Sequence, residues 1–319
     1  MVNQDEQRPD PDKLGPIRGT DLPFQAAVDA IIGARDEQQD AALIKQVDGG
    51  TGPPALLMVV ADGMGGHVGG AMASSLAVQA FGDAFADAAD QPVRDRLAFG
   101  LEHANQAIAS SIGANPELRG MGSTIVAALQ AGRTVEWVSV GDTLLLELGK
   151  GSIRRLNEDH SLGAVFDAQA ASGEISWDEA RSNPRRNMLR SALTGGPVAL
   201  TDYGQATLSA GKLLLLATDG ILSIADDRLI EIAESAAEPG SFAKHVLAQI
   251  VENMKEDQDN TTVVAAKIPG DTTRPILIDI SIFDGTKTKS RARVVVLSIC
   301  LVMIAAVAVY WTLTYFKLI

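Results

Sequence analysis

Cysteine and positive charge are both scarce in this sequence. The 319 residues contain one cysteine, Cys300, so the chain can form neither an internal disulfide nor a zinc site built on several cysteines. Lysine and arginine number 27 against 40 aspartates and glutamates, which gives a formal net charge of −13 at pH 7. Because a chain this acidic repels phosphate backbones, we expect no nucleic-acid partner.

The first 23 residues lack an apolar run and any helical or strand periodicity. They are rich in proline, aspartate and glutamine, so we expect a mobile leader over residues 1–23 and no secretory signal there. Hydrophobic residues nevertheless make up 46% of the chain, which is ordinary for a folded protein and excludes general disorder.

A continuous globular pattern runs from Phe24 to Ile268. Short apolar runs predict six buried strands: 56–61, 123–129, 135–140, 144–148, 213–217 and 261–268. Apolar residues recurring every three or four positions predict four helices: 71–85, 93–112, 229–236 and 242–254. Strands that follow one another closely, such as 124–129 and 135–140, favour antiparallel hairpins and an α+β fold.

The tail has a different character. Residues 269–293 contain prolines, a glycine and a basic run, which predicts a linker. Val294–Phe316 is apolar on all sides over its first eighteen residues, and about 20 such residues span a bilayer. Four basic residues (287, 289, 291 and 293) precede this segment, so we expect a single transmembrane helix that keeps the globular part on the cytoplasmic side of the cell membrane.

Five short motifs place carboxylates at the ends of strand-like runs. They are Arg35–Asp40, Val59–His67, Val138–Asp142, Leu216–Gly220 and Asp259–Val264. Several aspartates brought to one rim of a sheet repel each other unless cations lie between them. Oxygen ligands of this kind suit hard divalent ions such as Mg²⁺ or Mn²⁺. A lone Asp-Gly pair is usually only a turn, so the joint occurrence of the motifs carries the prediction.

In this order and spacing the motifs resemble those of the metal-dependent serine/threonine protein phosphatases of the 2C type, in their bacterial form. The residues that carry the resemblance are Arg35…Asp40, Asp62-Gly63-Met64-Gly65-Gly66-His67, Gly122-Ser123-Thr124, Val140-Gly141-Asp142, Leu193-Thr194-Gly195, Thr218-Asp219-Gly220 and Asp259-Asn260. The resemblance covers residues 24–268 as a catalytic domain. It implies a four-layer sandwich of two antiparallel β-sheets flanked by α-helices.

The resemblance also implies roles for particular residues. Arg35, Asp62 and Asp219 would be catalytic, and Arg35 would bind the substrate phosphate. Mn²⁺ or Mg²⁺ would be held by a set of six residues: Asp40, Asp62, Gly63, Asp142, Asp219 and Asp259. Within that set Asp62 would bridge two ions, the carbonyl of Gly63 would serve the second ion, and Asp142 would serve a third, weaker one.

The implied reaction is hydrolysis of phosphoserine or phosphothreonine in proteins. A hydroxide bridging two cations would attack phosphorus in line with the seryl or threonyl oxygen. The lone Cys300 lies in the apolar tail, which disfavours cysteine-dependent phosphatase chemistry. Phosphoproteins, including a serine/threonine kinase or its substrates, would be the partners, with the membrane as a further one.

The sequence departs from the family pattern in three of the motifs. Gln38 replaces an asparagine and keeps an amide, so we expect little loss there. Thr143-Leu144 replaces Ser-Arg after the Gly-Asp motif, which removes a cation near the third ion. Met64 stands where many eukaryotic members carry a histidine, and a thioether cannot donate a proton to the leaving group.

Two questions stay open at this level. The basic run Arg181, Arg185, Arg186 and Arg190 fits either a solvated face or a docking surface for acidic phosphopeptides. The domain could also be an inactive module that binds phosphoproteins or a membrane complex, although such a module has no need of every metal carboxylate. A phosphatase acting on a small metabolite would show the same motifs.

Overall fold

The computed structural model describes residues 25–47 and 55–270, and two antiparallel sheets organise them. The strands of the first sheet, in spatial order, are β1 (Ala26–Ile31), β11 (Thr261–Lys267), β10 (Leu213–Ala217), β7 (Leu144–Gly149) and β8 (Ser152–Arg155). Those of the second are β2 (Asp40–Val47), β3 (Ala55–Met64), β5 (Ile125–Ala131), β6 (Thr134–Val140) and β9 (Asp202–Thr207), with β4 (Gly122–Ser123) paired to β3. Every pairing between these strands is antiparallel.

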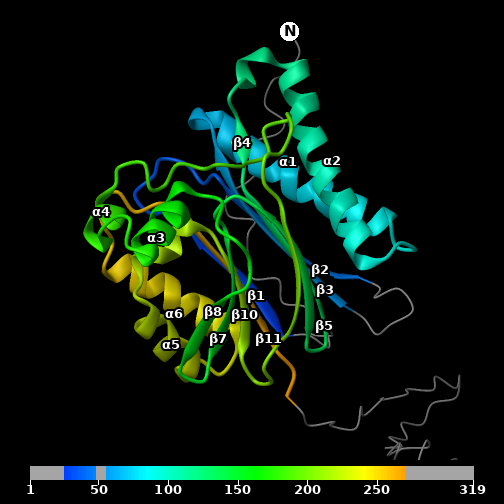
Figure 1. Cartoon of the computed structure of the whole chain (residues 1–319). Coiled ribbons are helices and arrows are strands. Elements are labelled where there is room, and N and C mark those ends of the chain that lie inside the picture. Colours follow the sequence, from blue (N-terminus) through cyan, green and yellow to red (C-terminus); the bar gives the residue numbers. More distant parts are fainter. Residues whose placement is uncertain (1–24, 48–54, 271–319) are drawn as a thin grey trace, which may run out of the picture. The chain divides into compact units, whose positions relative to one another are not determined.

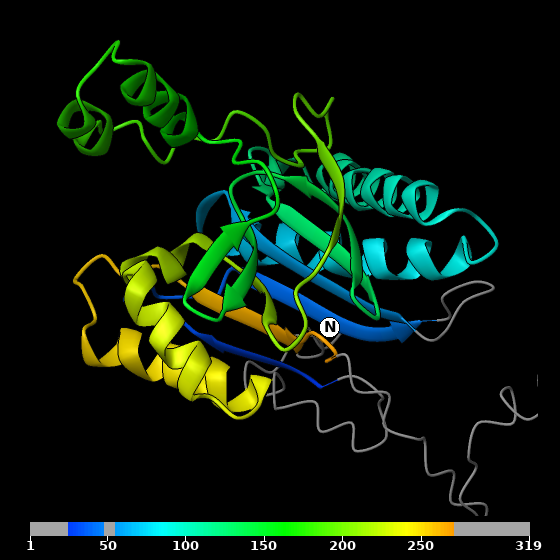
Figure 2. The same cartoon turned by 60° about the horizontal axis from the view of Figure 1, so that its bottom comes forward.

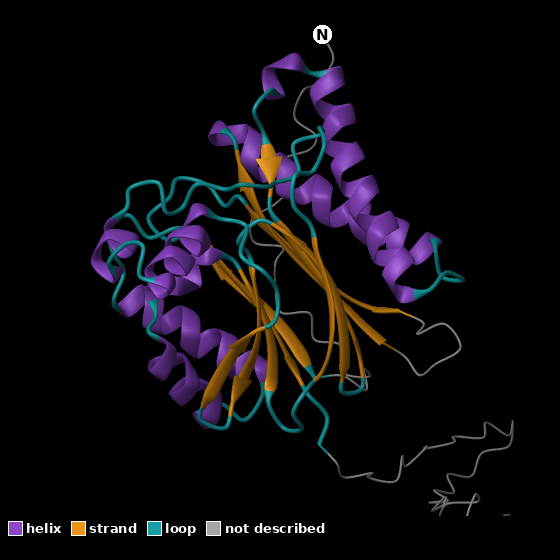
Figure 3. Cartoon of the chain, in the orientation of Figure 1, coloured by secondary structure: helices purple, strands orange, loops and turns teal. Residues whose placement is uncertain are grey.

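Helices cover the outer face of each sheet (Figures 1 and 3). The second sheet carries α1 (Gly66–Asp87) and α2 (Val93–Ala114), and the first carries α5 (Asp226–Ser235) and α6 (Pro239–Glu252). The order of layers is therefore helices, sheet, sheet, helices, which confirms the predicted four-layer α+β sandwich. Short 3₁₀ turns occur at Pro116–Leu118 and Asp219–Ser223.

Strand β3 shows why the apolar runs are continuous instead of alternating. Its side chains Leu57, Val59 and Ala61 pack toward α1 and α2. The intervening Leu56, Met58 and Val60 pack against the other sheet. Successive side chains of a strand point to opposite faces, and here both faces are covered. A strand buried on both sides reads as an unbroken hydrophobic run.

The segment 158–201 between β8 and β9, which we call the flap, contains α3 (Leu162–Ser172) and α4 (Trp177–Ser182). Figure 2 shows these two green helices standing apart from both sheets. A capping box fixes the start of α4, where Ser176 and Glu179 exchange hydrogen bonds. Gly173 ends α3 in the left-handed conformation (φ 81°) that favours glycine.

The predicted leader (1–23) and the predicted transmembrane helix (294–316) lie outside the described residues. Among the helices that the structure does describe, none combines the length and apolar character needed to cross a bilayer. All six predicted strands are present, with β4 and β5 sharing the 123–129 run. The four predicted helices are also present, each beginning and ending within a few residues of its expected bounds.

Candidate active site

One cleft of about 660 Å³ collects most of the predicted site residues. Its walls are formed by the ends of strands from both sheets and by the flap. The site residues that line it are Arg35, Asp62, Gly63, Asp142, Asp219 and Asp259. Asp40 is not part of the wall; it is buried behind it.

Asp40 and Asp62 are held side by side by the sheet itself. They are direct register partners on the antiparallel strands β2 and β3, so their backbones lie opposite each other. One carboxylate oxygen of Asp40 accepts hydrogen bonds from the hydroxyls of Thr218 (2.9 Å) and Thr262 (2.8 Å). Its other oxygen, Oδ1, is buried and has no hydrogen-bond partner within the described part of the chain.

Gly63 occupies a place where no side chain fits. A Cβ on this residue would lie 2.0 Å from the carbonyl oxygen of Gly70 and 2.7 Å from that of Gln39. The amide of Gly63 donates to the Gln39 carbonyl (3.0 Å), which fixes the peptide at the cleft wall. On the preceding residue, the Asp62 amide donates to the Thr124 hydroxyl (3.0 Å). The backbone that presents Asp62 and the Gly63 carbonyl is thus anchored on both sides.

Asp219 lies just after β10 and Asp259 just before β11, and these two strands are neighbours in the first sheet. Asp219 begins a 3₁₀ turn with one residue between it and the end of β10, and its Oδ1 is buried without a partner among residues 25–47 and 55–270. Asp259 forms an ion pair with the Arg35 guanidinium at 2.8 Å, and both side chains are partly exposed. Asn260 ties this corner together, because its amide donates to the carbonyls of Ile32 (2.7 Å) and Glu37 (3.0 Å).

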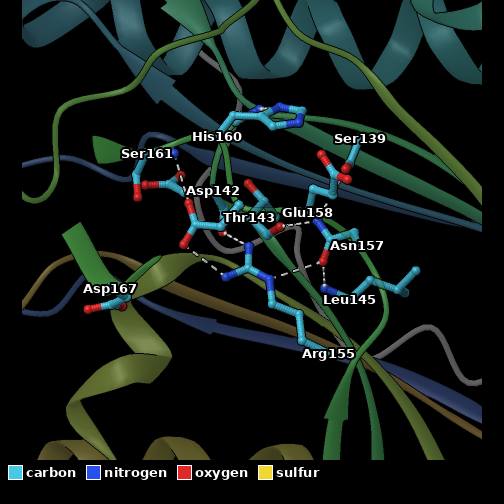
Figure 4. Close-up of polar contacts among 12 residues, drawn as sticks. Ser139, Asp142, Thr143, Leu145, Arg155, Asn157, Glu158, His160, Ser161 and Asp167 are labelled. Carbon is cyan, nitrogen blue, oxygen red and sulfur yellow. Dashed lines mark hydrogen bonds and ion pairs between the residues drawn. The ribbon is translucent and has the colours of Figure 1, made fainter. Parts of the chain in front are cut away.

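Asp142 lies in the turn that follows β6. Gly141 has a φ of 103°, and a Cβ there would lie 2.6 Å from the side chain of Thr124. Only glycine fits this close left-handed turn. The Asp142 carbonyl accepts a hydrogen bond from Arg155 (2.9 Å), so the turn is also held from the β8 side (Figure 4).

Four carboxyl groups in and behind this cleft have raised pKa values. Burial, followed by repulsion from neighbouring aspartates, raises the pKa of Asp40 to about 7 and that of Asp219 to about 6. The same causes raise the pKa of Asp142 to about 7 and that of Asp62 well above its usual range. The protein alone therefore supplies too little positive charge for the negative charge it gathers here.

Hard divalent cations fit this arrangement. The donors are oxygens, two buried carboxylate oxygens are without partners among the residues described, and Gly63 lines the cleft. In the described ranges no three aspartate, glutamate, histidine or cysteine side chains converge on one point. The carboxylates instead frame the cleft, so an ion there would need backbone carbonyls and water to complete its coordination.

The arginines of the basic run in the flap make different contacts. Arg186 forms a bidentate pair with Asp167 (2.8 and 2.7 Å) and donates to the Ala180 carbonyl, so it holds the flap together. Arg181 lies over the ring of Trp177, 5.6 Å from its centroid. Arg190 is exposed and lines the cleft opposite the strand ends.

Sequence reasoning did not foresee four supporting side chains. Thr218 and Thr262 stood in the quoted motifs but carried no assigned role, and they hold Asp40. Arg155 and Asn157 brace the Asp142 turn from outside any motif. The one available signal was local: hydroxyl residues occur next to the aspartates in both Thr218-Asp219 and Asp259-Asn260-Thr261-Thr262.

Comparison with known proteins agrees with this geometry. The family model for protein phosphatase 2C matches residues 32–266. The serine/threonine protein phosphatase PstP of Mycobacterium tuberculosis is 31% identical over 214 residues, which is 67% of this chain but only 40% of PstP. The serine/threonine phosphatase stp of Listeria monocytogenes is 30% identical over 65% of this chain and 82% of its own length.

A solved structure has the same fold. It is the catalytic domain of the serine/threonine protein phosphatase PstP in complex with two manganese ions, with a TM-score of 0.62 and 27% identity. The match covers 77% of this chain and 98% of that one. The chain described here therefore belongs to the protein phosphatase 2C family.

Proposed function

We propose that this chain is a metal-dependent phosphatase of phosphoserine and phosphothreonine in proteins. The observation that carries the proposal is the cleft, where Arg35 and four aspartates meet, with a fifth, Asp40, buried behind them. Two carboxylate oxygens of this group, on Asp40 and Asp219, have no hydrogen-bond partner among the described residues. Membership of the protein phosphatase 2C family supports the same conclusion. The names of the mycobacterial and listerial relatives indicate the substrate class.

The residues that would hold Mn²⁺ or Mg²⁺ are those framing the cleft. Asp62, Gly63, Asp219 and Asp259 line it, and Asp142 lines it from the turn after β6. Asp40 is buried behind these residues. When bound, such ions lower the pKa of a coordinated water and offset the charge of a phosphoryl group. The manganese-bound structure of PstP supports this assignment.

The chain's own cations would bind and orient the substrate phosphate. Arg35 carries a planar guanidinium that suits two phosphate oxygens at once. In the structure it pairs with Asp259, so it is already held at the rim of the cleft. Arg190 lies on the flap wall of the same cleft and would contact acidic groups that flank the phosphorylated residue.

Phosphate release from peptides tests the proposal. Full-length protein should release phosphate from a phosphoserine or phosphothreonine peptide with Mn²⁺ and stop when EDTA is added. Asp62→Asn should lose at least about 100-fold in kcat, because a residue of the ion site is gone. Asp90→Asn removes an equal charge from an exposed loop after α1 and should keep full activity. Turnover that is indifferent to EDTA contradicts the proposal.

The same assay separates the two competing functions. An inactive binding module would bind the phosphopeptide without releasing phosphate, and Mn²⁺ would make no difference to turnover. A metabolite phosphatase would hydrolyse phosphorylated sugars at least as efficiently as peptides, measured as kcat/KM. The full set of carboxylates in the cleft favours an active enzyme, and the flap wall favours an extended substrate.

We also propose that residues 294–316 anchor the protein in the cell membrane with the catalytic domain in the cytoplasm. The support is the uncharged run VVVLSICLVMIAAVAVYW and the basic residues before it. Full-length protein should sediment with membranes and resist carbonate extraction, whereas a chain ending at residue 286 should not sediment. Release of the full-length protein by carbonate contradicts the anchor, and digestion of the domain by protease outside intact cells contradicts the orientation.

A further inference from the structure

The turn that carries Asp142 and the start of the flap are joined by a polar network (Figure 4). The amide of Gly141 donates to Nδ1 of His160 (3.2 Å), and the amide of His160 donates back to the Gly141 carbonyl (3.1 Å). The amide of Arg190 donates to the His160 carbonyl (2.7 Å). His160, near the start of the flap, therefore contacts the Asp142 turn directly. Arg190, near the end of the flap, is joined to the turn through His160.

Arg155 lies where these parts meet. Its guanidinium donates to the Asp142 carbonyl (2.9 Å) through Nη2 and to the Asp159 carboxylate (3.1 Å) through Nη1. Its Nε donates to the amide oxygen of Asn157 (3.4 Å). All three guanidinium nitrogens of Arg155 thus donate hydrogen bonds: Nη2 to the turn, Nη1 to the flap, and Nε to Asn157 between them.

Asn157 extends the same bracing into the core. Its amide nitrogen donates to the Thr143 carbonyl (2.8 Å) and to the Ser139 hydroxyl (3.2 Å), and its oxygen accepts from the Leu145 amide (2.8 Å). Asn157 is buried, so each of these bonds is sheltered from water. Asn157 thus ties the backbone that follows Asp142 to the Ser139 side chain of β6, and Arg155 joins this framework to the flap beside the His160–Gly141 hydrogen bonds.

We propose that Arg155 is a positioning residue that holds the Asp142 turn and the entry of the flap as one unit. This inference rests on the proposed phosphatase function for its effect on turnover, but the positioning itself does not depend on it. Arg155 is not among the residues that line the cleft; it acts through the Asp142 carbonyl and through Asp159.

The neighbouring residues explain why Arg155 is the side chain that binds the Asp142 turn. Leu144, which directly follows the turn in β7, is buried in the core between the first sheet and its helices. Its side chain has no hydrogen-bond donor for the Asp142 carbonyl. Arg154, the other cation at the end of β8, is engaged with Glu147 on the opposite side of the strand (2.9 Å). Arg155 is therefore the cation that reaches the turn in the described structure.

Amide hydrogen exchange on the metal-free, full-length protein tests the positioning directly. Arg155→Ala should accelerate exchange of the Gly141 and His160 amides by about tenfold or more, because charge-assisted hydrogen bonds are lost. Arg186→Ala is the matched control, since it breaks a flap ion pair that does not reach the turn. It should accelerate exchange at Leu162 and Gly163 while leaving Gly141 unchanged.

Steady-state kinetics with Mn²⁺ and a phosphopeptide give the second measurement. Arg155→Ala should lower kcat/KM by about tenfold. Arg155→Lys keeps the charge but not the three-way fork, so it should recover less than half of the lost exchange protection. Full recovery by lysine would show that charge alone matters and would overturn the proposal. Unchanged exchange at Gly141 in Arg155→Ala would overturn it as well.

The two measurements separate the two proposals. If the wild-type protein shows no metal-dependent turnover while the exchange pattern is as expected, the proposed function fails and the positioning role stands. If turnover is metal-dependent but the exchange pattern is absent, the positioning role fails alone.

Discussion

Replacing Asp219 by asparagine should stabilise the metal-free protein while abolishing its activity. Asp219 is a carboxylate whose Oδ1 is buried without a partner in the described structure, and burial and Asp259 raise its pKa from 3.8 to about 6. A group whose pKa is higher in the folded than in the unfolded state binds its proton more tightly when folded. Its ionisation therefore opposes folding, and this cost is absent below about pH 4 and complete above about pH 6.

The size of the effect follows from the shift in pKa. The pKa of Asp219 rises by about two, and at 1.36 kcal/mol for each tenfold change this corresponds to about 3 kcal/mol of destabilisation at pH 8. Because the side chain is only half-buried, solvent screens part of this, and we expect about 1–3 kcal/mol. Asparagine cannot ionise and keeps the shape of the side chain. It should recover most of that free energy at pH 8 and little of it at pH 4.

Urea unfolding in EDTA, followed by tryptophan fluorescence, measures this difference. Trp137 is buried between the sheets and reports on the core. The free energy of unfolding of wild type should fall between pH 4 and pH 8, because Asp40, Asp62 and Asp142 have raised pKa values as well. In Asp219→Asn the fall should be smaller, and saturating Mn²⁺ should stabilise wild type more than the variant.

Two controls make the experiment decisive. Asp90→Asn removes an exposed charge far from the cleft and should follow the pH dependence of wild type. Phosphatase activity of Asp219→Asn should fall by at least about 100-fold, which separates stability from function. If wild-type stability in EDTA is flat across this pH range, or if Asp219→Asn is no more stable at pH 8, the electrostatic reasoning is refuted.

Three further predictions concern the walls of the cleft. Arg35→Ala should raise KM for phosphopeptides by about tenfold or more in steady-state kinetics, because a charge-assisted contact to phosphate is lost. The Mn²⁺ affinity of this variant, measured by calorimetry, should not fall, because Asp259 is freed from its ion pair. Gly63→Ala should unfold at lower urea concentration and lose activity, because its Cβ would lie 2.0 Å from the Gly70 carbonyl. Arg190→Ala should raise KM for peptides with acidic flanking residues and leave KM for 4-nitrophenyl phosphate unchanged; equal effects on both would contradict its role.

The central strands could be predicted from the sequence, and the edge strands could not. Runs such as 56–61 and 213–217 are apolar because both faces of their strands are covered. The four strands missed are β1, β2, β8 and β9, and all four lie at the edge of a sheet. An edge strand is only half-buried, so polar residues interrupt its apolar pattern and periodicity becomes too weak to detect.

The aspartates of the site could be predicted from the sequence, but the residues that support them could not. Asp62, Asp142 and Asp219 follow apolar runs, so their place at a rim could be inferred from strand ends alone. The hydroxyls on Asp40 come from positions 178 and 222 residues away, and no local pattern links such partners. Arg155 was missed for the same reason, since its role exists only once β8 lies beside the Asp142 turn.

The placement of β11 has a consequence for how the protein is made. This strand enters the first sheet between β1 and β10, and the residues just before it bring Asp259 to Arg35, which was synthesised 224 positions earlier. At about 5–20 residues per second, a ribosome needs on the order of 10–45 s to cover that distance. Throughout this time the nascent chain lacks one wall of the cleft and has an open gap in its sheet. If the protein is the proposed phosphatase, we expect the nascent chain to be inactive until β11 has left the ribosome and inserted between β1 and β10.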